Sequence, residues 1–333
     1  MRLRLAGKNI RIANMDLQLV TPAPLTINNG NTITARRWAA ILKKLGHRVR
    51  VTQSYDGKPC DALIALHARR SYDSIVRFHE RHPELPLIVV LTGTDVYRDI
   101  HEDAAARRSL ELATRLVALQ KMAVLELPRR FRTKADVIYQ SAEPLTAKRP
   151  QLNGKFEVCV IGHLREEKDP LRAAFAVRQL PSDSRIEVIH IGQAMEDEWD
   201  QAAKAEAENN PRYRWLGRQS HRKTRQRLAQ ANLVCITSKM EGSSNVLSEA
   251  LASGVPVVAT KISGLIGTLG KDFPGYYPVG NTAKLRRLLL RAERDRGFYE
   301  SLKRHCRKSA HLVEPRREMN AWRYLLRKSV PRK

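Results

Sequence analysis

The sequence predicts an α/β protein built from two doubly wound parallel sheets, each with helices on both faces. Short apolar segments alternate with longer amphipathic segments along most of the chain, which is typical of parallel strands joined by crossover helices. A polar, proline-containing stretch interrupts this alternation near the middle. The 333 residues, 42% of them hydrophobic, are enough for two packed cores. We therefore predict a first domain over 1–142, a linker over 143–154, a second domain over 155–312 and a terminal helical segment over 313–333.

In the first half, apolar runs indicate strands at 16–21, 49–52, 62–66, 87–91 and 136–139. Apolar residues recur on one face over 32–45, which indicates a helix. Parallel strands end at the same edge of a sheet, so functional residues are expected in the loops that follow them. The loop before the helix contains Asn28, Asn29, Gly30 and Asn31. Its backbone N–H groups could bind an anion, and a turn with an asparagine cap is the alternative.

Two further loops in the first half are unusually polar. His67 and Arg69 follow the strand at 62–66 and could bind an anionic acceptor. The loop after 87–91 contributes Thr92, Gly93, Asp95 and Arg98 to the same candidate site. Asp95 could orient a base or pair with Arg98. An exposed loop with a helix cap fits this spacing equally well, so the residues alone leave both interpretations open.

In the second half, strands are expected at 156–161, 186–191, 213–217, 233–237 and 255–259, and helices at 282–294, 298–311 and 315–328. Gly162 and His163 follow the first of these strands. They lead to a basic pair, Arg165 and Lys168, placed before a helix whose first residue is expected to be Pro170. A basic pair that follows a glycine and precedes a helix suits a diphosphate.

The stretch 238–264 is expected to form a loop, a helix, a turn and a buried strand. Glu241 lies in the loop, and Glu249 lies about one turn into the helix, so both carboxylates could face one cleft. Unpaired amides and the helix dipole favour an anion at the helix start. For the spacing of the two glutamates alone, solvated charges that complement the dipole are the simpler interpretation. The residues that open the helix are Gly242, Ser243, Ser244 and Asn245.

The whole string from Ser238, with Glu241-Gly242 and then EALASGVPVV from Glu249, resembles the donor signature of retaining GT-B glycosyltransferases of the glycosyltransferase 4-like group. The resemblance implies two Rossmann-like domains that face a cleft, and a terminal helix that crosses back to the first domain. It implies that Glu249 holds the ribose hydroxyls of a nucleotide sugar and that Glu241 lies by the sugar hydroxyls. Residues 216–218, including Arg218, occupy the positions at which members of the family contact the base of the nucleotide sugar.

The diphosphate loop departs from this family in one position. The family pattern is glycine, arginine, leucine and then lysine four residues later. Lys168 matches that lysine, while His163 stands in place of the arginine, and Arg165 could supply the missing charge. Which of His163 and Arg165 contacts the diphosphate stays open. We take Glu241, Arg165 and Lys168 as candidate catalytic residues.

Several strings in both halves resemble the selenosugar synthases of selenoneine biosynthesis. They are NNGN at 28–31 with TARRW at 34–38, HARRS at 67–71, LTGTDVYRDI at 91–100, YQS at 139–141 and GHLR at 162–165. This resemblance implies transfer of a sugar from UDP-glucose or UDP-N-acetylglucosamine to selenophosphate, with a new carbon–selenium bond. It also implies a functional partnership with the other enzymes of that pathway. The polar first-half loops would then bind a small phosphate-like anion.

The net charge of +26 leaves other partners open. Residues 284–333 contain 17 Lys and Arg against 5 Asp and Glu, so the terminal helices are the most basic part. A glycosyltransferase of envelope glycans, with these helices on anionic lipid, is the first alternative. A nucleic-acid-binding protein is the second, although aromatic residues are only 6% and no known binding module is visible. No nucleic-acid partner is therefore expected.

Compartment and cofactor expectations follow from what the sequence lacks. The first nine residues contain no apolar core of a signal peptide, and no apolar run is long enough to span a membrane. The four cysteines lie far apart without metal-site spacing. A cytoplasmic protein is therefore expected. No Asp-x-Asp motif is present, so we expect catalysis without a metal or another cofactor.

Overall fold

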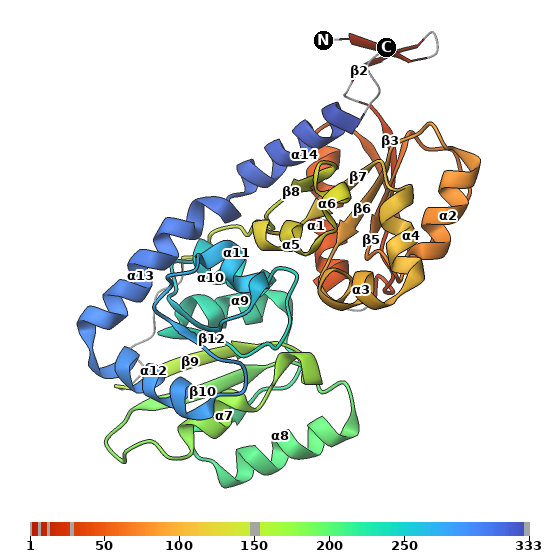
Figure 1. Ribbon diagram of the computed structural model, residues 1–333. Helices are drawn as coiled ribbons and strands as arrows, with labels where there is room; N and C mark the ends of the chain where they lie inside the picture. Colours follow the sequence, from red (N-terminus) through yellow and green to blue (C-terminus); the bar gives the residue numbers. More distant parts are fainter. Residues whose placement is uncertain (1, 6–7, 12–13, 27–29, 147–153, 330–333) are drawn as a thin grey trace. The chain divides into compact units, whose positions relative to one another are not determined.

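The computed structural model describes residues 2–5, 8–11, 14–26, 30–146 and 154–329 (Figure 1). The chain divides into two compact units, one formed by 1–140 with 315–333 and the other by 141–314. Part of the predicted linker, residues 147–153, lies outside the described residues. A short antiparallel hairpin, β1 (Arg2–Leu5) with β2 (Lys8–Arg11), precedes the first sheet.

The first unit contains a six-stranded parallel sheet in the order β4-β3-β5-β6-β7-β8. Its strands are β3 (Asp16–Val20), β4 (Arg48–Thr52), β5 (Ala62–Leu66), β6 (Leu87–Leu91), β7 (Arg115–Ala118) and β8 (Ala135–Val137). Its helices are α1 (Gly30–Lys44), α2 (Tyr72–Arg81), the π-helical turn η1 (Asp95–Asp99), α3 (Ile100–Glu102), α4 (Ala104–Leu112), α5 (Lys121–Glu126), α6 (Arg129–Arg132) and α14 (Pro315–Ser329).

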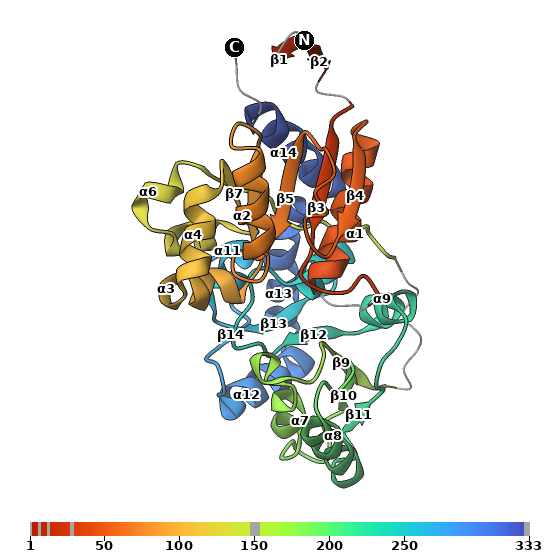
Figure 2. The same ribbon diagram turned by 90° about the vertical axis from the view of Figure 1, so that its right-hand side faces the viewer.

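Alternate residues of this sheet supply two separate cores, because successive side chains in a strand point to opposite faces. On β6, Ile88 and Val90 pack with α1 and α14, whereas Val89 and Leu91 pack with α2 and α4. Figure 2 shows α2 in front of the strands and α14 behind them. The central strands β5 and β6 are therefore apolar throughout, which explains why their sequences are continuous hydrophobic runs, whereas the edge strand β4 alternates arginine and valine.

The terminal helix α14 completes one of these two cores. Trp322 is fully buried and meets the ring of Trp38 on α1 edge to face, with 4.7 Å between centroids. The Trp38 indole Nε1–H donates to Glu318 Oε1 at 2.6 Å, and Arg37 forms an ion pair with the same carboxylate at 3.2 Å. The expectation that the last helix returns to the first sheet is confirmed.

The second unit contains another six-stranded parallel sheet, in the order β11-β10-β9-β12-β13-β14. Its strands are β9 (Phe156–Ile161), β10 (Ile186–Ile191), β11 (Tyr213–Trp215), β12 (Leu233–Ile236), β13 (Val257–Thr260) and β14 (Tyr276–Tyr277). Its helices are η2 (Glu166–Lys168), α7 (Arg172–Val177), α8 (Asp197–Asn209), α9 (His221–Gln230), α10 (Asn245–Ala252), α11 (Ser263–Leu269), α12 (Thr282–Arg294), α13 (Arg296–Ala310) and η3 (His311–Val313). Figure 1 shows α7 and α12 on one side of this sheet and α9 and α10 on the other.

The predicted fold class is confirmed, with local differences that have physical reasons. The inner strand β7 and the edge strand β14 were not predicted, and the two residues of β14 are too few to give a periodic signal. Strand β13 begins at Val257 instead of 255, after Pro256, which has no N–H for the ladder. Pro170 does not begin a helix: Asp169 takes a left-handed conformation with φ 44°, and α7 begins at Arg172.

We expect Trp322→Ala to destabilise the first unit by about 3–5 kcal/mol, because it empties the space between α14 and α1. Urea unfolding followed by circular dichroism measures this loss. Tyr324→Ala is the matched control on the same helix: Tyr324 is 62% exposed, so its removal should change stability by at most about 0.5 kcal/mol. Equal stability of the two variants would contradict the docking role of Trp322.

Candidate donor and acceptor sites

An ion pair joins the loops that follow β9 and β12 in the second unit. Lys168 Nζ donates to Glu241 Oε1 at 2.5 Å, and Ser238 Oγ donates to the same oxygen at 2.7 Å. A side-chain hydroxyl also holds the two loops together, since Thr237 Oγ1 donates to the Lys168 carbonyl oxygen at 2.7 Å. Lys168 and Glu241, which were predicted separately, therefore form an ion pair at the carboxyl edge of the sheet.

Two glycines allow backbone segments to approach this edge closely. A Cβ on Gly264, at the start of α11, would lie 1.8 Å from the Glu241 carbonyl oxygen. A Cβ on Gly192, after β10, would lie 1.8 Å from the Gly162 carbonyl oxygen. Both contacts are sterically possible only without a side chain. The carbonyl groups of Glu241 and Gly162, two predicted site residues, are therefore packed against the backbone of Gly264 and Gly192.

Helix α10 begins at Asn245, as predicted, and Ser244 caps it by accepting from the Leu247 N–H at 3.3 Å. Gly242 and Ser243 precede this cap. Glu249 lies one turn further along the helix. Its Oε1 is contacted by His221 Nε2 at 3.1 Å and by Arg225 Nε at 4.0 Å, both from α9. The sequence analysis did not identify these two partners, although their four-residue spacing places them on one helix face.

The remaining predicted donor residues occupy neighbouring loops of the second unit. Arg165 is half exposed and lies 3.8 Å from a Glu167 carboxylate oxygen, measured from its Nε. His163 Nδ1 accepts from the Gln193 N–H at 3.2 Å, so its ring faces the loop after β10. Arg218 lines a cavity of about 360 Å³. The other residues that line this cavity are Gln193, Ala194, Met195, Glu196, Asp197, Asp200, Trp215 and Gly217.

In the first unit, the buried carboxylate of Asp95 organises two loops. It accepts hydrogen bonds from the backbone N–H groups of Thr92, Gly93 and Val96 in its own loop, at 2.7–3.1 Å. It also accepts from the Ala68 N–H at 3.0 Å, in the loop after β5. The N–H groups of Thr92 and Gly93 are therefore engaged by the protein itself, so a direct backbone contact with an acceptor would have to displace Asp95.

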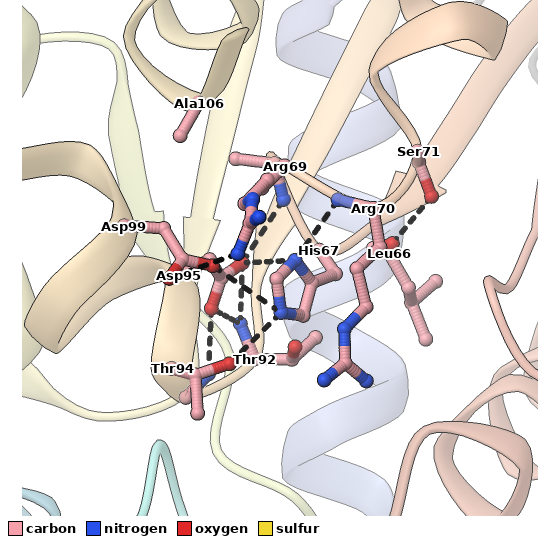
Figure 3. A network of polar contacts seen from close by, with 12 residues as sticks. Leu66, His67, Arg69, Arg70, Ser71, Thr92, Thr94, Asp95, Asp99 and Ala106 are labelled. Atoms are coloured by element: carbon pink, nitrogen blue, oxygen red, sulfur yellow. Dashed lines mark hydrogen bonds and ion pairs between the residues drawn. The ribbon is translucent and has the colours of Figure 1, made fainter. Parts of the chain in front are cut away.

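His67 lies beside this carboxylate in a left-handed conformation with φ 73° (Figure 3). Its Nδ1 accepts from the Arg70 N–H at 3.2 Å, so we assign the ring hydrogen to Nε2, which contacts Thr94 Oγ1 at 2.9 Å. The Nε2 atom is also 3.9 Å from Asp99 Oδ2. Burial lowers the pKa of His67, which keeps the imidazole neutral at pH 7.

The two arginines predicted to bind an acceptor are paired with carboxylates here. Arg69 Nε is 3.0 Å from Asp103 Oδ2, and Arg98 Nε donates to Asp99 Oδ1 at 3.1 Å. The suggested pairing of Arg98 with Asp95 is therefore wrong: the short π-helical turn directs Arg98 to Asp99 and turns Asp95 toward the backbone. Arg69 is 52% exposed and Arg98 is 44% exposed, so both guanidinium groups can be reached from solvent.

The start of α1 is the remaining part of the predicted acceptor site. Asn28 and Asn29 lie outside the described residues. Gly30 and Asn31 open the helix, and Thr34 Oγ1 donates back to the Gly30 carbonyl oxygen at 2.7 Å. Gln140 Nε2 donates to the same hydroxyl at 2.5 Å. Among the described residues, no atom lies within 4 Å of the position that a Gly30 Cβ would occupy.

Comparison with known proteins decides the family. The profile described as "Glycosyl transferases group 1" matches residues 143–310. The chain belongs to this family. The fold of this glycosyltransferase is similar to that of Anabaena Alr3699/HepE, solved in complex with UDP-glucose, with 16% identity and a TM-score of 0.71 over 95% of this chain and 99% of that one.

Two other solved structures show the same GT-B architecture. Sucrose-phosphate synthase (tll1590) from Thermosynechococcus elongatus has 15% identity and a TM-score of 0.75, over 95% of this chain and 98% of that one. The α,α-trehalose 6-phosphate synthase from Burkholderia multivorans has 11% identity and a TM-score of 0.66, over 80% of this chain and 70% of that one. At these identities the likeness shows the fold alone.

Across the described ranges, no group of three or more His, Cys, Asp and Glu side chains is arranged to hold a metal ion. Within the same ranges, no helix combines the length and apolar character needed to cross a membrane.

A buried histidine of the sheet contacts the backbone of the loop that begins at Gly162. His190 on β10 contacts the Gly162 carbonyl oxygen through Nε2 at 3.3 Å and the Tyr213 hydroxyl through Nδ1 at 3.0 Å. A neutral ring satisfies both contacts, with Nε2–H as donor and Nδ1 as acceptor. Burial lowers the pKa of His190 to about 4. The sequence analysis missed this residue because one histidine in an apolar strand gives no functional signal.

We expect the free energy of unfolding to fall as pH decreases from about 6.5 to about 4, because the unfolded chain binds a proton at His190 that the folded chain excludes. The full effect of this one residue is about 3 kcal/mol. Urea unfolding at pH 7 and pH 4.5 should show a larger loss for the wild type than for His190→Gln, which cannot titrate. Equal losses would contradict the assignment.

Proposed function

We propose that this glycosyltransferase transfers the sugar of a UDP-sugar to selenophosphate, as the selenosugar synthase of a selenoneine pathway. The observation that supports a nucleotide-sugar donor best is the Lys168–Glu241 pair between the diphosphate loop and the start of α10. The structure of Anabaena HepE in complex with UDP-glucose, which shares the fold, is consistent with such a donor. The selenophosphate assignment rests on the sequence resemblance of the first-unit loops.

In this proposal the second unit offsets the charge of the leaving UDP. The bond from the anomeric carbon to the diphosphate oxygen breaks, a carbon–selenium bond forms, and UDP leaves with the electron pair. Lys168 has three N–H donors, so it can keep Glu241 and still donate to a phosphate oxygen. Arg165 and the N-terminal amides of α10 add positive potential. Glu241 keeps its second oxygen for sugar hydroxyls. No metal is needed for this charge balance.

The first unit would bind the acceptor. Neutral His67 presents no positive charge, so Arg69 and Arg98 are the groups that would attract a small anion. Both already neutralise buried or half-buried carboxylates. An anion would therefore share these guanidinium groups with Asp99 and Asp103, which limits its affinity and favours a multiply charged ligand over a neutral sugar.

A UDP-release assay across acceptors tests the proposal directly. Purified enzyme is incubated with UDP-glucose or UDP-N-acetylglucosamine and with selenophosphate, thiophosphate, inorganic phosphate or water, with and without EDTA. The proposal expects UDP release that depends on selenophosphate, a selenium-containing sugar by mass spectrometry, and no loss with EDTA. Activity on lipid-linked glycans but not on selenophosphate would favour the envelope alternative. Salt-sensitive duplex binding without UDP release would favour the nucleic-acid alternative.

We expect Lys168→Ala to lower kcat about 10²–10³-fold with a smaller change in donor KM, since negative charge on the diphosphate grows as the glycosidic bond breaks. Steady-state kinetics with saturating acceptor measure this. Lys239→Ala is the matched control: Lys239 lies on the neighbouring loop, is 43% exposed and pairs with exposed Glu166 at 3.3 Å. A rise in KM alone for Lys168→Ala would show that Lys168 only anchors the donor.

We expect Arg69→Ala to reduce selenosugar formation about 10²-fold while UDP-sugar affinity, measured by calorimetry, stays within about twofold of the wild type. Arg108→Ala provides the control, because Arg108 is an exposed arginine of α4 in a surface pair with Glu111. Wild-type product yield from Arg69→Ala would remove Arg69 from the acceptor site. Loss of UDP-sugar binding would instead move it to the donor site.

A further inference from the structure

Two basic side chains of α9 converge on one oxygen of Glu249. His221 Nε2 lies 3.1 Å and Arg225 Nε 4.0 Å from Glu249 Oε1. They stand four residues apart on α9, so they lie one above the other on the same helix face. Ser220 caps this helix by accepting from the Lys223 N–H at 3.3 Å, which fixes where the face begins.

We propose that His221 and Arg225 are positioning residues that hold the Glu249 carboxylate ready for the ribose of the donor. This inference rests on the proposed function, because it takes Glu249 as the residue that binds ribose. Nothing in the donor signature itself includes α9. The structure thus adds a second element to the ribose site, and it does so through side chains that do not themselves need to touch the ligand.

The geometry suits orientation of the carboxylate. Both contacts reach Oε1 and neither uses Oε2, so these two side chains leave Oε2 available to accept hydroxyl protons. The Glu249 side chain is 12% exposed and the Arg225 side chain 15%, so their interaction is only partly screened by water. Arg225 is anchored at its other end, where Nη2 donates to the Glu143 carbonyl oxygen. A glutamate held in one rotamer loses less conformational entropy when ribose binds.

The packing of α9 against α10 does not depend on these polar contacts. Leu228 of α9 and Leu247 and Leu251 of α10 are buried in the apolar core of the second unit. His221, by contrast, is more than half exposed. A purely structural role would therefore affect stability slightly and donor recognition not at all. If the two residues position Glu249, their removal would reduce the contribution of the ribose hydroxyls to donor affinity.

Comparison of UDP with its 2′-deoxy and 3′-deoxy analogues separates these roles. Calorimetry gives the affinity of each nucleotide for the wild type and for Glu249→Ala, His221→Ala, Arg225→Ala and Arg225→Lys. The wild type should prefer UDP over at least one deoxy analogue by about 10-fold or more, and Glu249→Ala should abolish that preference. His221→Ala and Arg225→Ala should reduce it to about threefold. Both should raise donor KM more than they lower kcat, and Arg225→Lys should restore part of the preference.

Arg222→Ala is the control, because Arg222 is an exposed basic residue on the first turn of the same helix. It should keep the wild-type preference. If Glu249→Ala still discriminates between UDP and the deoxy analogues, the ribose role of Glu249 fails. If Glu249→Ala loses discrimination while His221→Ala and Arg225→Ala keep it, the positioning inference alone is overturned. Equal effects of Arg222→Ala would also overturn it. Thermal unfolding identifies any variant that does not fold. If Arg225→Ala does not fold, the preferences of His221→Ala and Arg225→Lys for UDP over its deoxy analogues test the inference.

Discussion

In a parallel sheet every strand ends at the same edge, and both units of this glycosyltransferase place their polar loops there. In the second unit this edge carries Gly162 after β9, Gly192 after β10 and Glu241 after β12. In the first unit it carries His67 after β5 and Asp95 after β6. Residues far apart in sequence become neighbours because the βαβ crossover returns each strand to the same direction. The shared direction of the strands therefore places the residues of each candidate site close together, whatever the chemistry of their side chains.

The two units use this edge differently. In the second unit, charged side chains pair with each other across loops, as Lys168 does with Glu241. In the first unit, the Asp95 carboxylate bonds to the backbone: it accepts from four N–H groups and, among the described residues, forms no ion pair with an arginine. The second unit therefore joins its loops through paired charges, while the first joins them through a buried carboxylate and has two solvent-accessible arginines nearby.

Several residues act on these edges without belonging to them. Neutral His190 bonds to the Gly162 carbonyl oxygen from inside the sheet, and Gly264 admits α11 against the Glu241 backbone. His221 and Arg225 reach Glu249 from a neighbouring helix. Each holds a loop or side chain in one arrangement, which lowers the entropy that ligand binding has to remove. The chemistry of the site thus extends beyond the motifs that mark it.

The sequence by itself determined the two parallel sheets and the start of α10 at Asn245, and it placed Lys168 and Glu241 in two loops that each follow a strand of the second sheet. Apolar runs, helix caps and a glycosyltransferase signature are local features, and local features can be read along the chain. Only the tertiary structure decided that Lys168 meets Glu241, that Arg98 pairs with Asp99 instead of Asp95, and that α9 supplies partners for Glu249. These contacts depend on crossover geometry and on a π-helical turn, and neither leaves a periodic pattern in the residues.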